Sequence, residues 1–284
     1  MKKTILFFAM LLLVAGCKKN QQGLAPVKVH VNNFSVVQEE FPTKGDPVGT
    51  YTGVKFFTLA FYAADGTELY NHTQERADAT TYETFGEFEC SLPMGTHTMV
   101  VLGYGGDAQF NLTSPTLATF TDSRLRDTFV KTQSVTISNN NGVEVSASLD
   151  RVVSMLGVVS TDNRTVEATK IRMTFTGGGQ NFNPTTGLAT TNTGFANTLA
   201  FVESPGTTIM SASFLFLDTD EQTMNITIET LDDDDNVLYA ETLNDVPFQR
   251  NRRTVLTGKV FTDGASASSF VINSDWLDDY NGPL

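Results

Sequence analysis

The sequence predicts an all-β protein built from antiparallel β-sandwiches. Apolar and polar residues alternate in many short stretches, such as Val27–Val31, which is the two-residue period of a strand with one buried face. Turn sequences such as Asp65-Gly66 and Asn141-Gly142 separate these stretches. No window of a dozen residues shows a 3.6-residue period, so we expect only few and short helices.

The N-terminus has the pattern of an export signal with a lipidation site. A positively charged start precedes an apolar run from Ile5 to Val14, which is too short for a membrane-spanning helix. The run ends in a lipobox, in which cleavage between Gly16 and Cys17 leaves Cys17 to carry the lipid. Each buried methylene contributes about 0.8 kcal/mol, so several acyl chains hold a protein firmly at a membrane. We expect residues 1–16 to be the signal peptide and 17–26 a polar tether. The alternative is an ordinary signal peptide with a chance cysteine.

Composition restricts the function classes. The formal net charge of −13 argues against binding to nucleic acid or anionic lipid headgroups, because like charges repel. The chain has two cysteines, and a lipidated Cys17 leaves Cys90 without a disulfide partner. Cys90 alternates with Phe88 and Leu92 on the buried side of an expected strand. We therefore interpret Cys90 as a small core residue rather than a nucleophile.

The first half of the chain contains seven expected strands, which follow the alternation of apolar residues. They lie at Val27–Phe34 and at residues 54–62, 67–70, 88–92, 97–104, 134–138 and 143–149. Residues 103–111 and 113–127 lack a sustained alternation, and we expect loops there, with one helical turn at most.

The second half repeats this style without visible sequence repetition. An apolar passage runs up to Val159, and we expect the chain to cross between two domains near residues 147–153. The expected domains are residues 27–148 and 149–284. Residues 177–198, which are rich in Gly, Thr and Asn, are expected to form a loop. Strands are expected at residues 171–175, 210–216, 224–228, 237–242, 254–261 and 270–276.

No cluster of residues in the sequence predicts catalysis. The four aspartates Asp232–Asp235 stand where a hairpin needs a turn, and a calcium site is the alternative interpretation. The three histidines have no metal-ligand spacing and no Cys or Ser partner nearby. Arg250–Arg253, the only basic cluster, reads as a charged turn before a strand. We therefore expect a protein without enzymatic activity, metal or cofactor.

Three segments resemble the fimbrillin superfamily, the subunits of type V pili of Gram-negative anaerobes from gut and mouth. The segment Phe85–Val101, which contains FGEF and SLPMGTHTMVV, resembles their "FG.F...LP.G.YTLVV" hairpin. Asp127–Phe129 together with Leu149–Val153 resembles the passage between their two domains. Val246–Gly258 resembles their "VP..RN..T...G" segment. His97 stands where Tyr is usual, a change that we expect a surface strand to tolerate.

The resemblance implies two transthyretin-like β-sandwich domains and assembly by strand exchange. In shaft subunits of this family, a protease cuts after an Arg near the N-terminus and removes the lipid and the first strand. No arginine occurs between Cys17 and Glu75, and the intervening loop offers only Lys44 as a candidate processing site. The resemblance therefore favours a lipid-retained anchor or minor subunit. The candidate exchanged strands contain Val27, Val29, Val31, Phe270 and Ile272.

The expected function is a structural one at the cell surface. The partners are other fimbrial subunits, the outer membrane through the lipid anchor, and ligands on host or bacterial surfaces, but no nucleic acid. The alternative is a surface glycan-binding lipoprotein of a polysaccharide-uptake system. Such binders stack sugars on exposed Trp or Tyr, and this chain has one tryptophan, Trp276, and seven tyrosines.

Overall fold

The computed structural model describes residues 23–35, 53–76, 85–107, 110–122, 124–262 and 271–273. These residues form nineteen strands and no helix, which confirms the predicted all-β class. None of the described residues belongs to an apolar helix long enough to cross a membrane. The strands of the first half are β1 (Leu24–Ser35), β2 (Phe56–Tyr62), β3 (Glu68–Glu75), β4 (Glu87–Pro93), β5 (Gly95–Tyr104), β6 (Phe110–Ser114), β7 (Leu117–Phe120), β8 (Thr128–Ile137) and β9 (Val143–Arg151).

The strands of the second half are β10 (Ser154–Ser160), β11 (Lys170–Phe175), β12 (Asn181–Asn183), β13 (Leu188–Ala189), β14 (Phe195–Ala200), β15 (Met210–Leu215), β16 (Glu221–Leu231), β17 (Val237–Gln249), β18 (Arg253–Gly258) and β19 (Val271–Asn273). β1 begins three residues before the expected start, so Leu24–Pro26 pair with β4 and do not belong to the expected tether.

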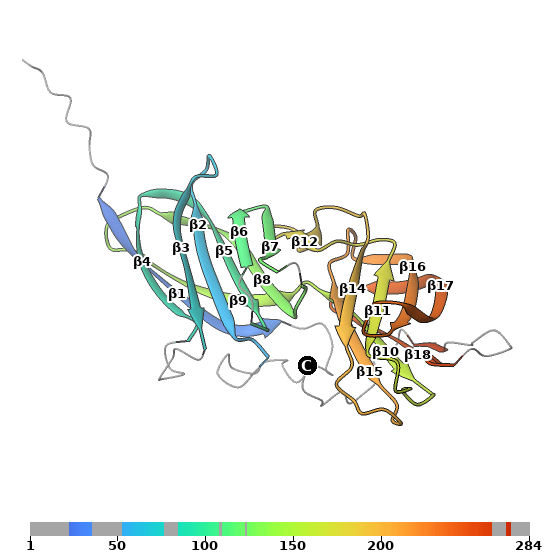
Figure 1. The fold of residues 1–284 in the computed structure, drawn as a ribbon. Helices are drawn as coiled ribbons and strands as arrows, with labels where there is room; N and C mark the ends of the chain where they lie inside the picture. Colours follow the sequence, from blue (N-terminus) through green and yellow to red (C-terminus); the bar gives the residue numbers. More distant parts are fainter. Residues whose placement is uncertain are drawn as a thin grey trace, which may run out of the picture.

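The first half forms a sandwich from one folded sheet with the order β3-β2-β5-β8-β9-β1-β4 (Figure 1). β8 and β9 meet over only two residue pairs, Phe129 with Arg151 and Val130 with Asp150, so the sheet turns at this point. The layer β4-β1-β9 then packs against the layer β3-β2-β5-β8 through a shared apolar core. β1 runs antiparallel to β4 and parallel to β9.

The second half repeats this arrangement strand for strand. Its two sheets have the orders β15-β10-β18-β19 and β14-β11-β16-β17, which match β4-β1-β9 and β3-β2-β5-β8. In each half the first strand runs parallel to one of its two neighbours in the layer: β1 beside β9, and β10 beside β18. The strand β19 has no counterpart among the described strands of the first half. The two halves are thus two sandwiches of one topology, as the fold class predicts.

A small fourth sheet, of order β13-β12-β7-β6, joins the two halves (Figure 1). β7 from the first half pairs with β12 from the second, with Thr119 opposite Asn181 and Ala118 opposite Phe182. The expectation of loops over residues 103–127 and 177–198 is therefore wrong in part, since β6, β7, β12, β13 and β14 lie there. These strands have two to six residues each, and β7 and β12 pair across the two halves, so local alternation gives a weak signal.

The joining sheet buries the second face of β2 and β5. Every residue of β2 is buried: Phe57 and Leu59 face the core of the first sandwich, whereas Tyr62 faces a core shared with the second half. Aromatic rings fill that shared core, with centroids 3.8 Å apart for Phe110 and Phe120 and 4.4 Å for Phe182 and Phe216. The two halves are therefore held together by a common apolar core.

The burial of His97 differs from the sequence-based expectation. His97 on β5 is 6 % exposed, and its Nε2 lies 2.8 Å from the carbonyl oxygen of Pro93. The expectation of a surface position is wrong, because the turn before β5 brings a carbonyl acceptor to the ring. Cys90 is half-buried against the core, and burial raises the pKa of its thiol to about 11, which suits a packing role.

Candidate functional site

The first strand, β1, completes the core of the first sandwich. Ala25, Val27 and Val29 are fully buried and Val31 is 4 % exposed, so one face of the strand is a continuous apolar row. Its backbone pairs with β4 from Leu24 to His30 and with β9 from Val27 to Ser35. Without β1, the facing backbone groups of both neighbours would lose their partners beside an open core.

The outer face of β1 is held by ion pairs to both neighbouring strands. Lys28 Nζ lies 2.9 Å from Glu89 Oε1 on β4. His30 contacts Glu87 on β4 through Nδ1, and its Nε2 lies 2.7 Å from Glu144 Oε1 on β9. Burial opposes the charged form of His30, but the two carboxylates outweigh it and raise the pKa of His30 above its usual value. A protonated His30 therefore ties β1 to both neighbouring strands. We call the position of β1 between β4 and β9 the slot of β1.

The last described strand, β19, lies at the edge of its sheet. It pairs only with β18 among the described strands, with Ile272 opposite Leu256, and Val271 is 64 % exposed. Three paired residues hold a strand weakly. Phe270, the other candidate residue of this exchanged strand, lies outside the described residues. The same is true of Gly16, Cys17 and Lys44, so lipidation and processing stay predictions.

The motif residues at the passage between the halves form a buried ion pair. Arg151 Nε and Nη2 donate to the two carboxylate oxygens of Asp127, at 2.8 and 2.9 Å. Both residues are buried, and the guanidinium lies 4.7 Å from the ring centre of Phe129. A bidentate pair of this kind fixes orientation strongly. It locks the end of β9 to the segment before β8, where the chain enters the second sandwich.

The third motif forms the turn between β17 and β18. Asn251 has a φ of 59°, a left-handed conformation that Asn tolerates better than most residues. Its N–H donates to the carbonyl oxygen of Val153, at 2.9 Å. Across the turn, Thr254 Oγ1 donates to the carbonyl oxygen of Pro247, at 2.6 Å. The turn is thereby docked onto the passage between the two halves.

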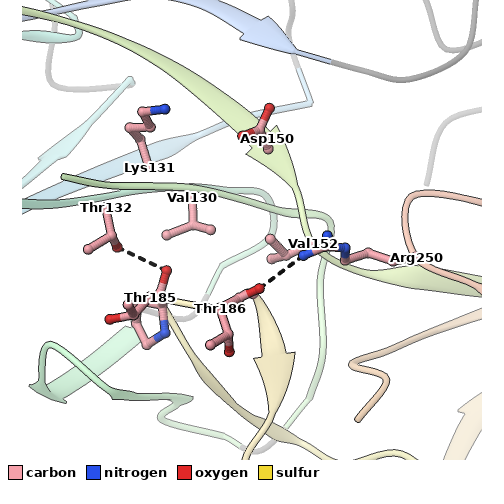
Figure 2. A pocket seen from close by; sticks show the side chains of 10 residues that line it. Val130, Lys131, Thr132, Asp150, Val152, Thr185, Thr186 and Arg250 are labelled. Atoms are coloured by element: carbon pink, nitrogen blue, oxygen red, sulfur yellow. Dashed lines mark hydrogen bonds between the residues drawn. The ribbon is translucent and has the colours of Figure 1, made fainter. Parts of the chain in front are cut away.

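A polar hollow of about 130 Å³ lies beside this turn (Figure 2). Thr132 on β8 donates to the carbonyl oxygen of Pro184, at 2.9 Å, and Arg250 Nη1 donates to that of Thr186, at 3.0 Å. These bonds tie the first sandwich and the β17–β18 turn to the loop between β12 and β13. The remaining wall includes Lys131 and Asp150.

A second hollow, of about 290 Å³, adjoins the first, and we call the two together the junction groove. The two hollows share Asp150 and Arg250. Every residue that lines the second hollow is polar: Asp150, Arg151, Asp220, Gln249, Arg250, Asn251 and Arg252. Sequence reasoning treated Arg250–Arg253 only as a charged turn and missed the groove. The walls of the groove come from five separate segments of the chain, so no local sequence pattern predicts it.

The four aspartates form the turn between β16 and β17. The carboxylate of Asp232 accepts hydrogen bonds from the N–H groups of Asp234 and Asn236, at 2.9 and 2.8 Å. Bonds from Asn236 above all lower the pKa of Asp232. Lys170 Nζ lies 2.7 Å from Asp235 Oδ1. Among the described residues, no group of three or more His, Cys, Asp or Glu side chains is arranged to hold a metal ion.

Solved structures with the same fold include proteins described as candidate adhesins. One from Bacteroides ovatus is 12% identical, with coverage of 83% of this chain and 88% of that chain and a TM-score of 0.52. A candidate polysaccharide-binding protein from Bacteroides thetaiotaomicron is 11% identical, with coverage of 91% and 100% and a TM-score of 0.50. The fimbrial anchor protein Mfa2 from Porphyromonas gingivalis is 12% identical, with coverage of 91% and 100% and a TM-score of 0.48.

The chain therefore shares its fold of two sandwiches with proteins described as candidate adhesins and polysaccharide-binding proteins. At such identities the similarity establishes the fold alone. The chain belongs to DUF6562, a family of unknown function, whose profile matches residues 110–282, more than half of the chain. No curated protein matches the sequence significantly.

Proposed function

We propose that this protein is a non-catalytic structural subunit of a cell-surface fimbria of the type V class. The observation that carries the proposal is the slot of β1: an apolar strand, paired on both edges, completes the core of the first sandwich. A strand from another subunit can occupy such a slot by β-augmentation, with backbone bonds for affinity and the apolar row for specificity. The partners are then other fimbrial subunits.

Within the fimbria, we assign the chain to a lipid-retained anchor or minor subunit. The first arginine after Cys17 is Arg76, which follows β3 directly inside the folded sandwich. Its Nε donates to the carbonyl oxygen of Val54, at 2.8 Å, and its guanidinium lies 4.5 Å from the ring centre of Phe85. An Arg-specific protease therefore finds no site in the segment before the fold. The proposed division is a signal of residues 1–16, a tether and domains of residues 27–148 and 149–284, with the first domain extended at its two ends to Leu24 and Arg151 by β1 and β9.

Cell fractionation with N-terminal sequencing tests this assignment. We expect the mature chain to start at a lipidated Cys17 in the outer membrane, and Cys17→Ala to remain an unprocessed precursor. Inhibition of the lipoprotein signal peptidase by globomycin should trap the same precursor. A mature chain that begins at Gly45, after cleavage at Lys44, would contradict the anchor assignment and favour a shaft or tip subunit.

A glycan-binding surface lipoprotein is the second candidate function. The observation that favours it is the junction groove, in which only hydrogen-bonding side chains line the larger hollow. Immobilised neutral and acidic oligosaccharides test it directly, because a purely structural subunit binds none of them.

A further inference from the structure

We propose that residues 274–284 of the chain dock into the junction groove as an acidic tail. This tail follows β19 and lies outside the described residues; its sequence, SDWLDDYNGPL, has three aspartates and no cation. The charge of the groove, the direction of β19 and the short pairing of β19 support the docking. It is independent of the fimbrial function, and a docked tail would compete with a glycan for the same groove.

The junction groove is lined by more positive than negative side chains. Its charged lining residues are four cations and two carboxylates: Lys131, Arg151, Arg250, Arg252, Asp150 and Asp220. Two of the cations already have carboxylate partners. Arg250 Nη2 lies 2.8 Å from Asp220 Oδ1, and Arg151 is paired with Asp127.

A positive excess persists when these two pairs are set aside. Lys131 and Arg252 then stand against the single carboxylate of Asp150. Lys131 makes no ion pair to any described residue. The whole chain has 32 acidic and only 19 basic residues, so a groove with the opposite sign differs from its surroundings. Complementary charge favours an acidic occupant.

The direction of β19 leads the chain toward the groove. The last pair of β19 joins Asn273 to Val255, three residues after Arg252 in the groove wall. Because β19 runs antiparallel to β18, the chain leaves Asn273 in the direction of the β17–β18 turn. An extended chain advances about 3.4 Å per residue, so Arg252 is about 10 Å away along the strand, and Asp278 and Asp279 can reach about 17–20 Å. The tail is therefore long enough to bring both aspartates into the groove.

The pairing of β19 is short, and a docked tail would strengthen it. Three residue pairs join β19 to β18, and Val271 is 64 % exposed. A strand with so few pairs is held weakly. A segment tethered beside its site has an effective concentration on the order of millimolar, so a few charge contacts suffice for docking. The tail would thus keep β19 on its sheet until salt or a competing anion displaces it.

Cross-linking with a carbodiimide, which joins an amine to a carboxylate in direct contact, tests the docking. The complete chain from residue 18 is treated, and the joined peptides of the monomer are identified by mass spectrometry. We expect Lys131 to be joined to Asp278 or Asp279. Lys131→Arg keeps the positive charge without the amine, and this variant should lose the cross-link. In a mixture of isotope-labelled and unlabelled protein, a cross-link only between different chains would overturn docking within one chain and indicate a second copy.

Trp276, the only tryptophan of the chain, reports the state of the tail in solution. Asp278→Asn/Asp279→Asn should make acrylamide quench its fluorescence about twofold more strongly, and so should about 1 M salt on the unaltered chain, because the Debye length is then about 3 Å. Asp233→Asn/Asp234→Asn, which removes two charges from the exposed β16–β17 turn, is the matched control and should leave quenching unchanged. Equal quenching of all three proteins at low and high salt, or no cross-link to Lys131, would overturn the proposal.

Discussion

The buried pair of Arg151 and Asp127 should contribute more to stability than any exposed ion pair of the chain. Arg151 is 4 % and Asp127 6 % exposed, and two hydrogen bonds of 2.8 and 2.9 Å join them. Arg151→Met keeps most of the volume but leaves a buried carboxylate without its cation. Such a loss costs about 3–5 kcal/mol. At about 3 °C per kcal/mol for a chain of this size, the melting temperature should fall by about 9–15 °C.

The double variant Asp127→Leu/Arg151→Met distinguishes charge from packing. It removes both charges and should recover most of the loss, because apolar replacements of a buried pair are often neutral. Lys28→Met, which breaks the exposed pair with Glu89, is the control and should change stability little. Thermal unfolding monitored by near-ultraviolet circular dichroism measures all three. A fall below 3 °C for Arg151→Met, or a double variant less stable than the single one, would refute the reasoning.

Two further predictions concern the outer face of β1 and the aspartate turn. His30 has a raised pKa in the folded state, so its contribution is fully present below its unfolded value of about 6.5 and is lost as pH rises through the folded value. The melting temperature should therefore fall between pH 6 and 8 by more in the unaltered chain than in His30→Gln. If the melting temperatures of the two proteins change with pH in parallel, the contacts of His30 with Glu87 and Glu144 contribute nothing to stability. In the turn, Asp233→Asn/Asp234→Asn should leave the melting temperature unchanged with or without calcium, since the bonds of the turn converge on Asp232. A calcium-dependent rise that the variant loses would reveal an ion site.

The sequence predicted those strands in which apolar and polar residues alternate along the chain. Val27, Val29 and Val31 face the core as their spacing indicates, and the turn at Asp232–Asn236 lies where its residues favour one. The strands β7 and β12 were missed because they pair with each other between the halves, and local alternation does not indicate a partner about sixty residues away. The short strand β6, which pairs with β7, was missed with them. Their sheet also buries the second face of β5, which removes the alternation that an outward-facing strand shows.

The site was predictable only where it coincides with a strand. The slot of β1 follows from an apolar row near the N-terminus, whereas the junction groove depends on how two sandwiches meet. The motif residues Asp127, Arg151 and Asn251 were recognised as a resemblance, but only the structure shows that two form a buried ion pair and the third a left-handed turn. Their partners are separated by 24 and 98 residues in the chain, beyond the reach of pattern reasoning.

Strand exchange at the slot of β1 is the most direct test of the proposed function. A sequence-specific protease site placed after Lys44 allows β1 to be severed from the folded chain. We expect the nicked protein to retain β1 until an excess of labelled peptide with the sequence of residues 24–35 replaces it. The same peptide with Asp at positions 27, 29 and 31 should not compete, because those side chains face the core. Equal incorporation of both peptides, or unchanged thermal stability after β1 is washed away, would contradict the account.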